Sequence, residues 1–424
     1  MRIRTLASSV TLTLTCALLF LNAAAAPPAA AQSEPPAPVV AWAAAHITPL
    51  ENLQPFDSVI GHARVIGLGE AAHGVQQFYS FRNRLVESLI ERGEITAIAA
   101  ETGYSESVAA DDYINGRGDV SPRVVGSVFS WSMDASYSEN RALLDWLRAY
   151  NARTATKRKI HFYGVDLTGG RAGRFVDAHV ALDAALRYVA AVDTQQARIL
   201  NQRLTNLLPR FSSAGHDSLT APDQNALTAA ISDLVSLFER RQLTWQSATS
   251  AEAYDRAYHQ AIVARQLDAN FRSASPESNP QAQREAAMAQ NLLWVLSREG
   301  LQSRIFLYAA NWHISKGPMW TDRFGTALGE HVRAMLGRDY VAIGTTYSNG
   351  DPAPSPTSVG AMLARLGVPE GLLSLHDVPS GGPVAEWFRT PRGLVGGRID
   401  SMAVNQAFDA VVFIGAVRPA ETDR

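Results

Sequence analysis

Five side chains that could move a proton or stabilise an anion stand in short motifs along the chain. Glu70 and His73 occur in G-E-A-A-H-G, Arg82 follows shortly after, and Glu101 and His313 occur in A-E-T-G and N-W-H-I. Histidine suits proton transfer near neutral pH, a nearby carboxylate can fix its tautomer, and arginine can stabilise an oxyanion. Glu101 could also hold Arg82 in a buried ion pair. These residue types favour activation of water at a carbonyl carbon, without a covalent nucleophile.

Four further side chains could contribute to the same site. Asp166 ends an apolar run, where it either binds the site or caps the following turn. Tyr104 could donate to an oxyanion, although a plain turn accounts for it equally well. Trp131 and Trp312 belong to the core by default, or line an apolar substrate pocket.

Apolar runs bounded by turn signals predict the elements that position these residues. We expect strands over 64–68, 95–100, 159–165, 303–309, 340–345 and 407–415. Helical spacing predicts helices between most of them, including 76–92, 142–151 and 326–336. Strands joined by helices pair in parallel with right-handed crossovers. We therefore predict an α/β fold with a largely parallel central sheet covered by helices.

The predicted sheet explains how residues far apart in the sequence could meet. The polar side chains named above follow the strands, and parallel strands present their carboxyl ends at one edge. Ligands of open α/β sheets bind at that edge. We therefore expect Glu70, His73, Glu101, Asp166 and His313 to converge there.

One long stretch lacks strand signals altogether. Between about residues 175 and 300 the periodicity is only helical, with candidates over 175–192, 194–208, 223–242, 253–271 and 282–298. We predict an all-helical insertion between two strands of one sheet, which either adds core or caps the site. A single domain then spans 41–424, after a Pro-rich flexible leader over 32–40.

The N-terminal segment is typical of a secretory signal peptide. Residues 1–31 have a basic start, an apolar run too short to cross a bilayer and a small-residue tail. We expect cleavage after Ala31, a periplasmic or secreted protein, and no stable membrane anchor. The single cysteine, Cys16, lies in this segment, so the mature chain would lack thiol chemistry, disulfides and Cys-ligated metal.

The composition limits the classes of partner, and the motifs that are missing limit the classes of reaction. The chain has 424 residues, 46% of them hydrophobic and 18% charged, with a net charge of −2. This near-neutral balance gives no electrostatic footprint for nucleic acid. The sequence contains neither the G-x-S-x-G motif of serine hydrolases nor the H-E-x-x-H motif of zinc proteases. The remaining candidates are histidine and carboxylates.

Several segments closely resemble the erythromycin esterase family. The likeness covers nearly all of the mature chain and is carried by V-I-G-L-G-E-A-A-H-G, F-Y-S-F-R-N-R-L, A-I-A-A-E-T-G-Y-S-E, D-D-Y-I-N-G-R-G, D-W-L-R-A-Y-N, F-Y-G-V-D-L, R-E-A-A-M-A-Q-N, N-W-H-I-S-K, L-G-R-D-Y-V-A-I-G and F-D-A-V-V-F-I. The G-E-x-x-H-G block, with its following arginine and glutamate, is the most specific of these.

The resemblance implies a hydrolase of carboxylic esters, because characterised members open the lactone ring of macrolide antibiotics without a metal or other cofactor. It implies that His73 is the base that activates water, and that Glu70 and Glu101 support it. Arg82 would polarise or position the substrate, and His313 would assist near the ester. The expected partner is a small-molecule ester or lactone.

Two departures from the family pattern leave the substrate open. A second histidine common in the family is replaced here by Ala310, and the export signal differs from macrolide-resistance esterases that act inside the cell. Two alternative functions remain. A metallohydrolase could use the same glutamates and histidines as zinc or manganese ligands. An exported, non-catalytic protein could bind a carboxylated or sugar-containing ligand with Arg82 as a clamp.

Overall fold

The computed structural model describes residues 34–119, 121, 136–153, 158–169, 178–273, 279–317, 325–350, 353–395 and 402–422. The predicted signal peptide and Trp131 lie outside these residues. Within them, no helix combines the length and the apolar character needed to cross a membrane.

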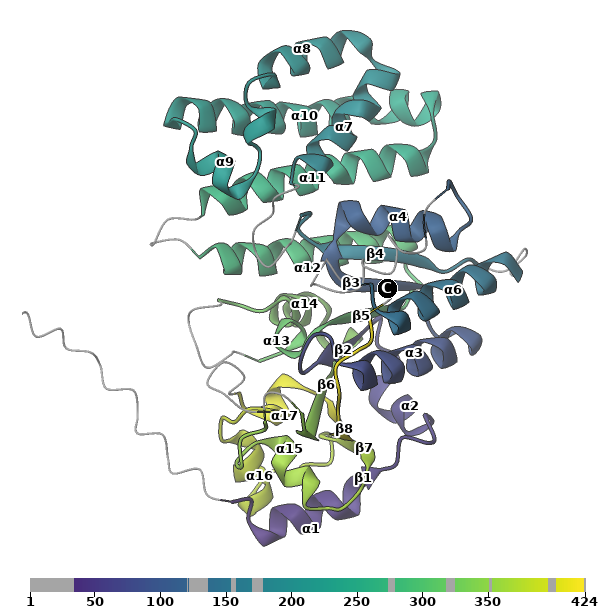
Figure 1. Cartoon of the computed structure of the whole chain (residues 1–424), viewed down its shortest axis with the longest axis vertical. Helices are drawn as coiled ribbons and strands as arrows, with labels where there is room; N and C mark the ends of the chain where they lie inside the picture. Colours follow the sequence, from purple (N-terminus) through teal and green to yellow (C-terminus); the bar gives the residue numbers. More distant parts are fainter. Residues whose placement is uncertain are drawn as a thin grey trace, which may run out of the picture. The chain divides into compact units, whose positions relative to one another are not determined.

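A mixed eight-stranded sheet in the order β1-β7-β8-β6-β2-β5-β3-β4 organises the fold (Figure 1). Its parallel strands are β2 (Val65–Glu70), β3 (Ala97–Gly103), β4 (His161–Asp166), β5 (Ile305–Ala310), β6 (Tyr340–Asn349) and β8 (Ala410–Ala416). These strands read as continuous apolar runs because helices cover both faces of the sheet. The predicted α/β fold with a largely parallel sheet is confirmed.

The edge beyond β8 differs from the prediction. Strand β7 (Glu370–Ser374) runs antiparallel to β8, and the two-residue β1 (Ile47–Thr48) runs antiparallel to β7. Both strands are too short to show a period. Helix α1 (Ala37–His46) begins inside the segment predicted as a flexible leader. Its prolines occupy the cap and the first turn, where a helix tolerates proline, so a Pro-rich composition concealed a helix start.

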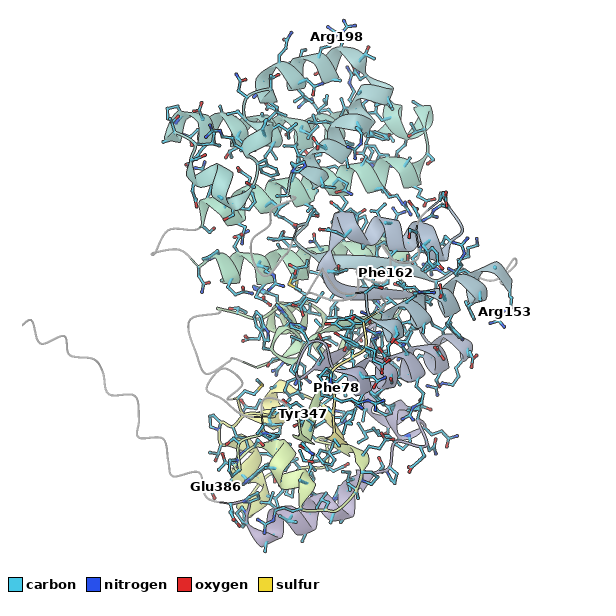
Figure 2. All side chains as sticks on the ribbon, viewed as in Figure 1. Phe78, Arg153, Phe162, Arg198, Tyr347 and Glu386 are labelled. Carbon is cyan, nitrogen blue, oxygen red and sulfur yellow. The ribbon has the colours of Figure 1, made fainter. Side chains whose placement is uncertain are left out.

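Side chains alternate across each strand and divide the core into two layers. Along β5, Phe306 and Tyr308 belong to one cluster, and Ile305, Leu307 and Ala309 belong to the other. We call the first layer the α3 face; it is covered by α2 (Pro55–Ile60), α3 (Gln76–Glu91), α4 (Tyr104–Ile114) and α6 (Ser138–Arg153). Phe78, Phe162 and Tyr347, labelled in Figure 2, lie in this layer.

The opposite layer, which we call the α12 face, takes its helices from both ends of the chain. They are α1, α12 (Pro280–Glu299), α13 (Asn311–Ile314), α14 (Leu328–Leu336), α15 (Val359–Ala364), α16 (Gly382–Arg389) and α17 (Val404–Ala407). The short 3-10 helix η2 (Gly337–Asp339) leads from α14 into β6. Each face can therefore present a different helix to the same strand ends.

Among the described residues between β4 and β5, helices are the only regular elements, as predicted. This stretch contains α7 (His179–Val192), α8 (Thr194–Leu204), η1 (Leu208–Arg210), α9 (Ser213–Asp217), α10 (Ala221–Ala248), α11 (Ala251–Arg272) and α12. Side-chain caps mark many of the helix starts, where oxygens of Asp193, Ser212, Thr220, Ser250 and Asn279 accept backbone N–H groups. Helices α7, α8, α10 and α11 share a third apolar cluster, and α12 contacts this cluster through Ala287 while most of its buried residues pack against the sheet.

Candidate active site

Polar side chains meet at the carboxyl ends of neighbouring strands. The order β2-β5-β3-β4 places the ends of these strands side by side, and they carry Glu70, Glu101 and Asp166, with His313 on α13 directly after β5. Alternation along the strands directs Glu70 to the α3 face and Glu101 to the α12 face. Two hydrogen-bonded groups therefore form at one edge of the sheet.

The first group, which we call the exposed pair, joins Glu70 and His73. His73 Nδ1 lies 2.5 Å from Glu70 Oε1, and the side chain of His73 is 36% exposed, against 6% for Glu70. Tyr308, the neighbour of Leu68 in the β2–β5 register, donates its hydroxyl to the other carboxylate oxygen, Glu70 Oε2, at 2.6 Å. With its proton on Nδ1, neutral His73 carries its lone pair on Nε2.

Two glycines let the backbone form this turn. Gly74 has a φ of 71°, a left-handed conformation that glycine adopts without strain. At Gly69 a Cβ atom would lie 2.3 Å from Asn311 Oδ1, so only glycine allows β2 to approach α13 this closely. The G-E-A-A-H-G motif is thus a strand end followed by a tight turn.

Glu70 determines the protonation of His73. Burial lowers the pKa of His73, but the charge of Glu70 and its hydrogen bond outweigh burial and raise the pKa to about 9. The charge of Glu101 raises this pKa and that of His313 lowers it, so the second group also acts on His73. His73 therefore binds a proton at neutral pH and becomes a strong base above it.

Arg82 lies beneath the exposed pair and has no exposed surface. Its guanidinium donates to Asn83 Oδ1 at 2.8 and 3.0 Å and to Asn140 Oδ1 at 2.8 Å. The same group lies over the rings of Tyr308 and Tyr79, with its carbon 4.7 and 5.0 Å from their centroids. The guanidinium of Arg82 therefore contacts the ring of Tyr308, whose hydroxyl donates to Glu70.

The second group, which we call the buried network, centres on Glu101. Glu101 Oε1 lies 2.9 Å from His313 Nε2 and accepts from Arg284 Nη2 at 3.1 Å. Arg284 also donates to both oxygens of Asp166, at 2.8 and 2.5 Å. The predicted ion pair between Glu101 and Arg82 is therefore wrong, because α12 supplies the arginine on the face to which Glu101 points.

His313 is enclosed by carboxylates. Its Nδ1 lies 2.8 Å from Glu285 Oε2, its Nε2 faces Glu101, and its side chain has no exposed surface. Burial lowers the pKa of His313, but the charges of Glu101 and Glu285 outweigh burial and raise it to about 9. Burial likewise raises the pKa of Glu101, and His313 holds it well below its usual range. Protonated His313 thus donates from both ring nitrogens and holds the two glutamates in place.

The structure adds three residues that the sequence did not single out as site residues. Arg284 and Glu285 are consecutive on α12, on the buried stripe that also carries Met288 and Leu292. Two adjacent charges on an apolar stripe were the available signal, because buried charges are rare unless paired. Tyr308 gave no signal, since a tyrosine in a buried strand normally indicates packing.

The remaining candidates fall in different places. Asp166 binds Arg284 and also accepts the backbone N–H of Leu167 at 2.7 Å, which places it in the buried network. The ring of Trp312 lies 3.7 Å from that of His313. Tyr104 is not brought to either polar group; its ring packs edge-on against His259 and Trp294, at 4.4 and 5.5 Å between centroids.

The glutamates and histidines of the metal alternative are divided between the exposed pair and the buried network. Among the residues that the structure describes, no three His, Cys, Asp or Glu side chains form a group that could hold a metal ion. Within the buried network the position opposite Glu101 is taken by a guanidinium and an imidazole. The carboxylates of the buried network are therefore paired with cationic side chains.

The sequence comparisons find a family model and relatives that share one description, erythromycin esterase. A family model described as Erythromycin esterase matches residues 90–417. Erythromycin esterase type II of Escherichia coli is 24% identical over 320 residues, which cover 72% of this chain and 73% of that protein. Erythromycin esterase type I of Escherichia coli is 32% identical over 110 residues, 26% of this chain and 25% of that one.

Solved structures show the same fold at lower identity. A Bacillus cereus protein has a TM-score of 0.74 at 21% identity. The match covers 91% of this chain and 99% of that protein. A succinoglycan biosynthesis protein has a TM-score of 0.75 at 20% identity, with 91% and 98% covered. A mutant of the erythromycin esterase EreC in its open conformation has a TM-score of 0.67 at 17% identity, with 88% and 95% covered.

Proposed function

The chain belongs to the erythromycin esterase family and is a hydrolase that acts on ester bonds; we propose that His73 activates the water that cleaves a carboxylic ester or lactone. The hydrogen bond of 2.5 Å between His73 Nδ1 and Glu70 carries this proposal. It fixes the tautomer whose lone pair lies on Nε2, and it stabilises the imidazolium that forms when Nε2 takes a proton.

The proposed reaction needs only water and the ester. As the water oxygen bonds to the carbonyl carbon, one of its protons passes to His73 Nε2 and the carbonyl oxygen takes the negative charge. The tetrahedral intermediate then expels the alkoxide, which receives the proton from His73. The products are a carboxylic acid and an alcohol, or one open-chain hydroxy acid when the substrate is a lactone.

The environments of the two histidines support His73 as the base. His73 has one carboxylate partner in the exposed pair and a partly exposed ring, whereas His313 has a carboxylate at each ring nitrogen and no exposed surface. Glu101 and His313 act on His73 through their charges. We therefore propose positioning roles for the buried network and for Arg82.

The proposed substrate class is the macrolide lactone, which the names of the relatives support. The test is a panel of macrolides and 4-nitrophenyl esters, with product mass measured; ring opening adds one water to the macrolide. At pH 9, His73→Gln and Glu70→Gln should lose activity with an unchanged circular dichroism spectrum. His179→Gln, at an exposed position on α7, is the matched control and should behave as the wild type.

Each alternative function gives a different result in this experiment. Full activity in both variants would refute water activation by His73. Activity that is lost on chelation and restored by a metal, together with metal in elemental analysis, would favour the metallohydrolase. If the purified protein turns over none of the esters, the non-catalytic binding function is favoured.

We also propose that the protein acts outside the cytoplasm, after cleavage at Ala31. The basic start, short apolar run and small-residue tail of residues 1–31 support this. N-terminal sequencing of protein from the periplasmic and culture fractions should find Gln32 at the new terminus. Full-length protein confined to the cytoplasmic fraction would contradict export.

A further inference from the structure

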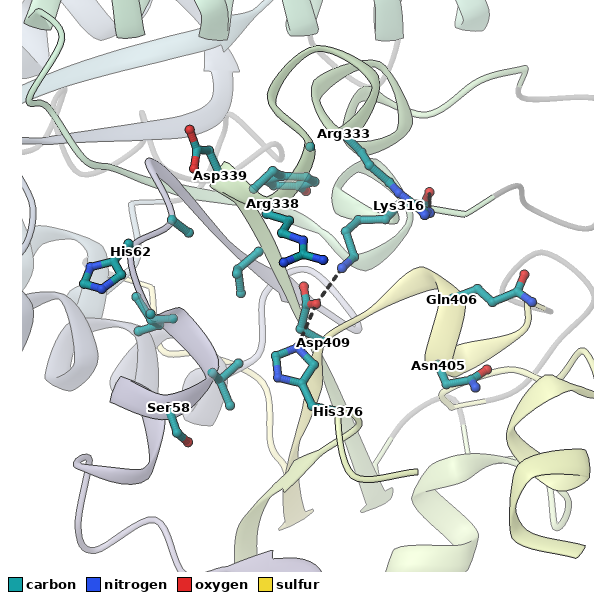
Figure 3. A pocket seen from close by; sticks show the side chains of 17 residues that line it. Ser58, His62, Lys316, Arg333, Arg338, Asp339, His376, Asn405, Gln406 and Asp409 are labelled. Carbon is teal, nitrogen blue, oxygen red and sulfur yellow. Dashed lines mark hydrogen bonds and ion pairs between the residues drawn. The ribbon is translucent and has the colours of Figure 1, made fainter. Parts of the chain in front are cut away.

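A recess lies at the amino ends of β2, β6 and β8, at the edge of the sheet opposite the candidate active site (Figure 3). It has a volume of about 990 Å³, within the range of small-molecule sites. The turn after α2, helix η2 and Asp409 line it just before these three strands begin. Lys316, Arg333 and His376 line it from other segments.

Both carboxylate oxygens of Asp409 are hydrogen-bonded to neighbouring groups of the protein. Its Oδ1 accepts from Lys316 Nζ at 2.6 Å and lies 3.0 Å from His376 Nε2, while its Oδ2 accepts the backbone N–H of Ala342 at 2.8 Å. The side chains of Asp409 and Lys316 are 11% and 15% exposed. The charge of Lys316 is therefore balanced within the recess.

Two arginines remain without such balance. Arg333 donates to the backbone carbonyl of Lys316 at 3.1 Å, and neither Arg333 nor Arg338 forms an ion pair with any acidic group that the structure describes. Figure 3 shows the guanidinium of Arg338 directed towards Lys316 and Asp409, whereas the carboxylate of Asp339 points away. Both arginines are exposed side chains that line the recess, and their positive charges attract an anion that enters it.

We propose that this recess binds the phosphate group of a soluble phosphate monoester. The two unbalanced arginines carry two positive charges, which a phosphate dianion matches and a single carboxylate would match only in part. Guanidinium groups bind phosphate oxygens through paired hydrogen bonds. A lone phosphate fills only a small part of about 990 Å³, and the remaining space, beside Ser58 and His62, receives the organic part.

The test is calorimetric titration of the full chain with inorganic phosphate and with glycerol 3-phosphate, at constant ionic strength set with chloride. The wild type should bind glycerol 3-phosphate with a Kd of about 1 mM or tighter. Arg338→Gln should weaken binding about tenfold, and adding Arg333→Gln should abolish it. Arg198→Gln, on the exposed surface of α8 (Figure 2), removes the same charge and should bind as the wild type. Hydrolysis of a 4-nitrophenyl ester should be equal in all four proteins.

Several outcomes would overturn the proposal. Failure of the wild type to bind either probe would do so, as would unchanged binding in Arg338→Gln. Equal weakening in Arg198→Gln would indicate a bulk charge effect in place of a site. Binding to phosphatidic acid vesicles without binding of either soluble probe would assign the recess to a membrane surface.

Discussion

The pH dependence of ester hydrolysis tests the exposed pair directly. Glu70 raises the pKa of His73 to about 9, and only neutral His73 can take a proton from water. At pH 7 about one molecule in a hundred then has a neutral His73, and at pH 9 about half of them do. We therefore expect kcat/KM to rise about fiftyfold between pH 7 and pH 9.

The substitution Glu70→Gln separates the effect of this carboxylate on the pKa of His73 from its effect on the rate of hydrolysis. Without its charge, burial outweighs the remaining charge of Glu101, so the pKa of His73 should fall from about 9 to its ordinary value of 6.5 or lower. The rising limb of the pH profile should move by the same amount. The rate at its plateau should fall about 10²- to 10⁴-fold, because glutamine neither fixes the tautomer nor stabilises the imidazolium by its charge.

The assay is steady-state hydrolysis of a 4-nitrophenyl ester from pH 5 to 10, corrected for the rate without enzyme. An NMR titration of His73 in both proteins gives its pKa independently of turnover. Glu386→Gln, on the exposed surface of α16 and labelled in Figure 2, is the matched control. A rising limb that stays near pH 9 in Glu70→Gln would refute the assignment of this limb to His73.

Three further predictions follow from the buried contacts. Tyr308→Phe removes the hydroxyl that Glu70 accepts at 2.6 Å and should lower kcat about 10- to 100-fold with little effect on KM. Arg284→Met leaves Asp166 without its ion-pair partner and should lower the free energy of unfolding in urea by about 3–5 kcal/mol. The raised pKa of His313 gives stability that is complete below pH 6.5 and is lost as pH rises through about 9, so Tm should fall between pH 7 and pH 10.

Each of these predictions has a control in the same chain. Tyr258→Phe removes a hydroxyl bonded to Glu239 at the surface and should leave kcat unchanged. Arg203→Met breaks an exposed ion pair with Asp233 and should cost about 0–1 kcal/mol. In His313→Gln the fall of Tm at alkaline pH should be shallower. Equal effects in the test and control variants, or an unchanged slope in His313→Gln, would contradict the assigned roles.

The parallel sheet and the edge where its polar side chains meet could be predicted because both depend on local patterns. Buried strands read as apolar runs, and the helix between two of them makes the pairing parallel. That pairing alone brings Glu70 and Glu101 to one edge. Strand order could not be predicted, since it depends on crossovers that leave no local trace, and so neither could the contact between Tyr308 and Glu70.

The arginine predicted as the partner of Glu101 was the wrong one. Arg82 and Arg284 were both visible in motifs, and Arg82 is nearer to Glu101 in sequence. The pairing is decided by the face of the sheet: Glu101 follows Ala100, which points to the α3 face, so Glu101 itself points to the α12 face. Counting alternation from the end of the strand would have directed Glu101 towards α12 and away from α3.

The same alternation explains why two carboxylate–histidine pairs at one edge differ in chemistry. On the α3 face, Tyr308 binds the glutamate that pairs with His73, and the His73 side chain is partly exposed. On the α12 face, Arg284 and protonated His313 carry two positive charges among the three carboxylates of Asp166, Glu101 and Glu285, and these paired groups are buried. Neutralising His313 would leave the network with two uncompensated negative charges, and this cost keeps the proton there. A negative, buried network beside the pair can then raise the basicity of His73 without competing for its proton.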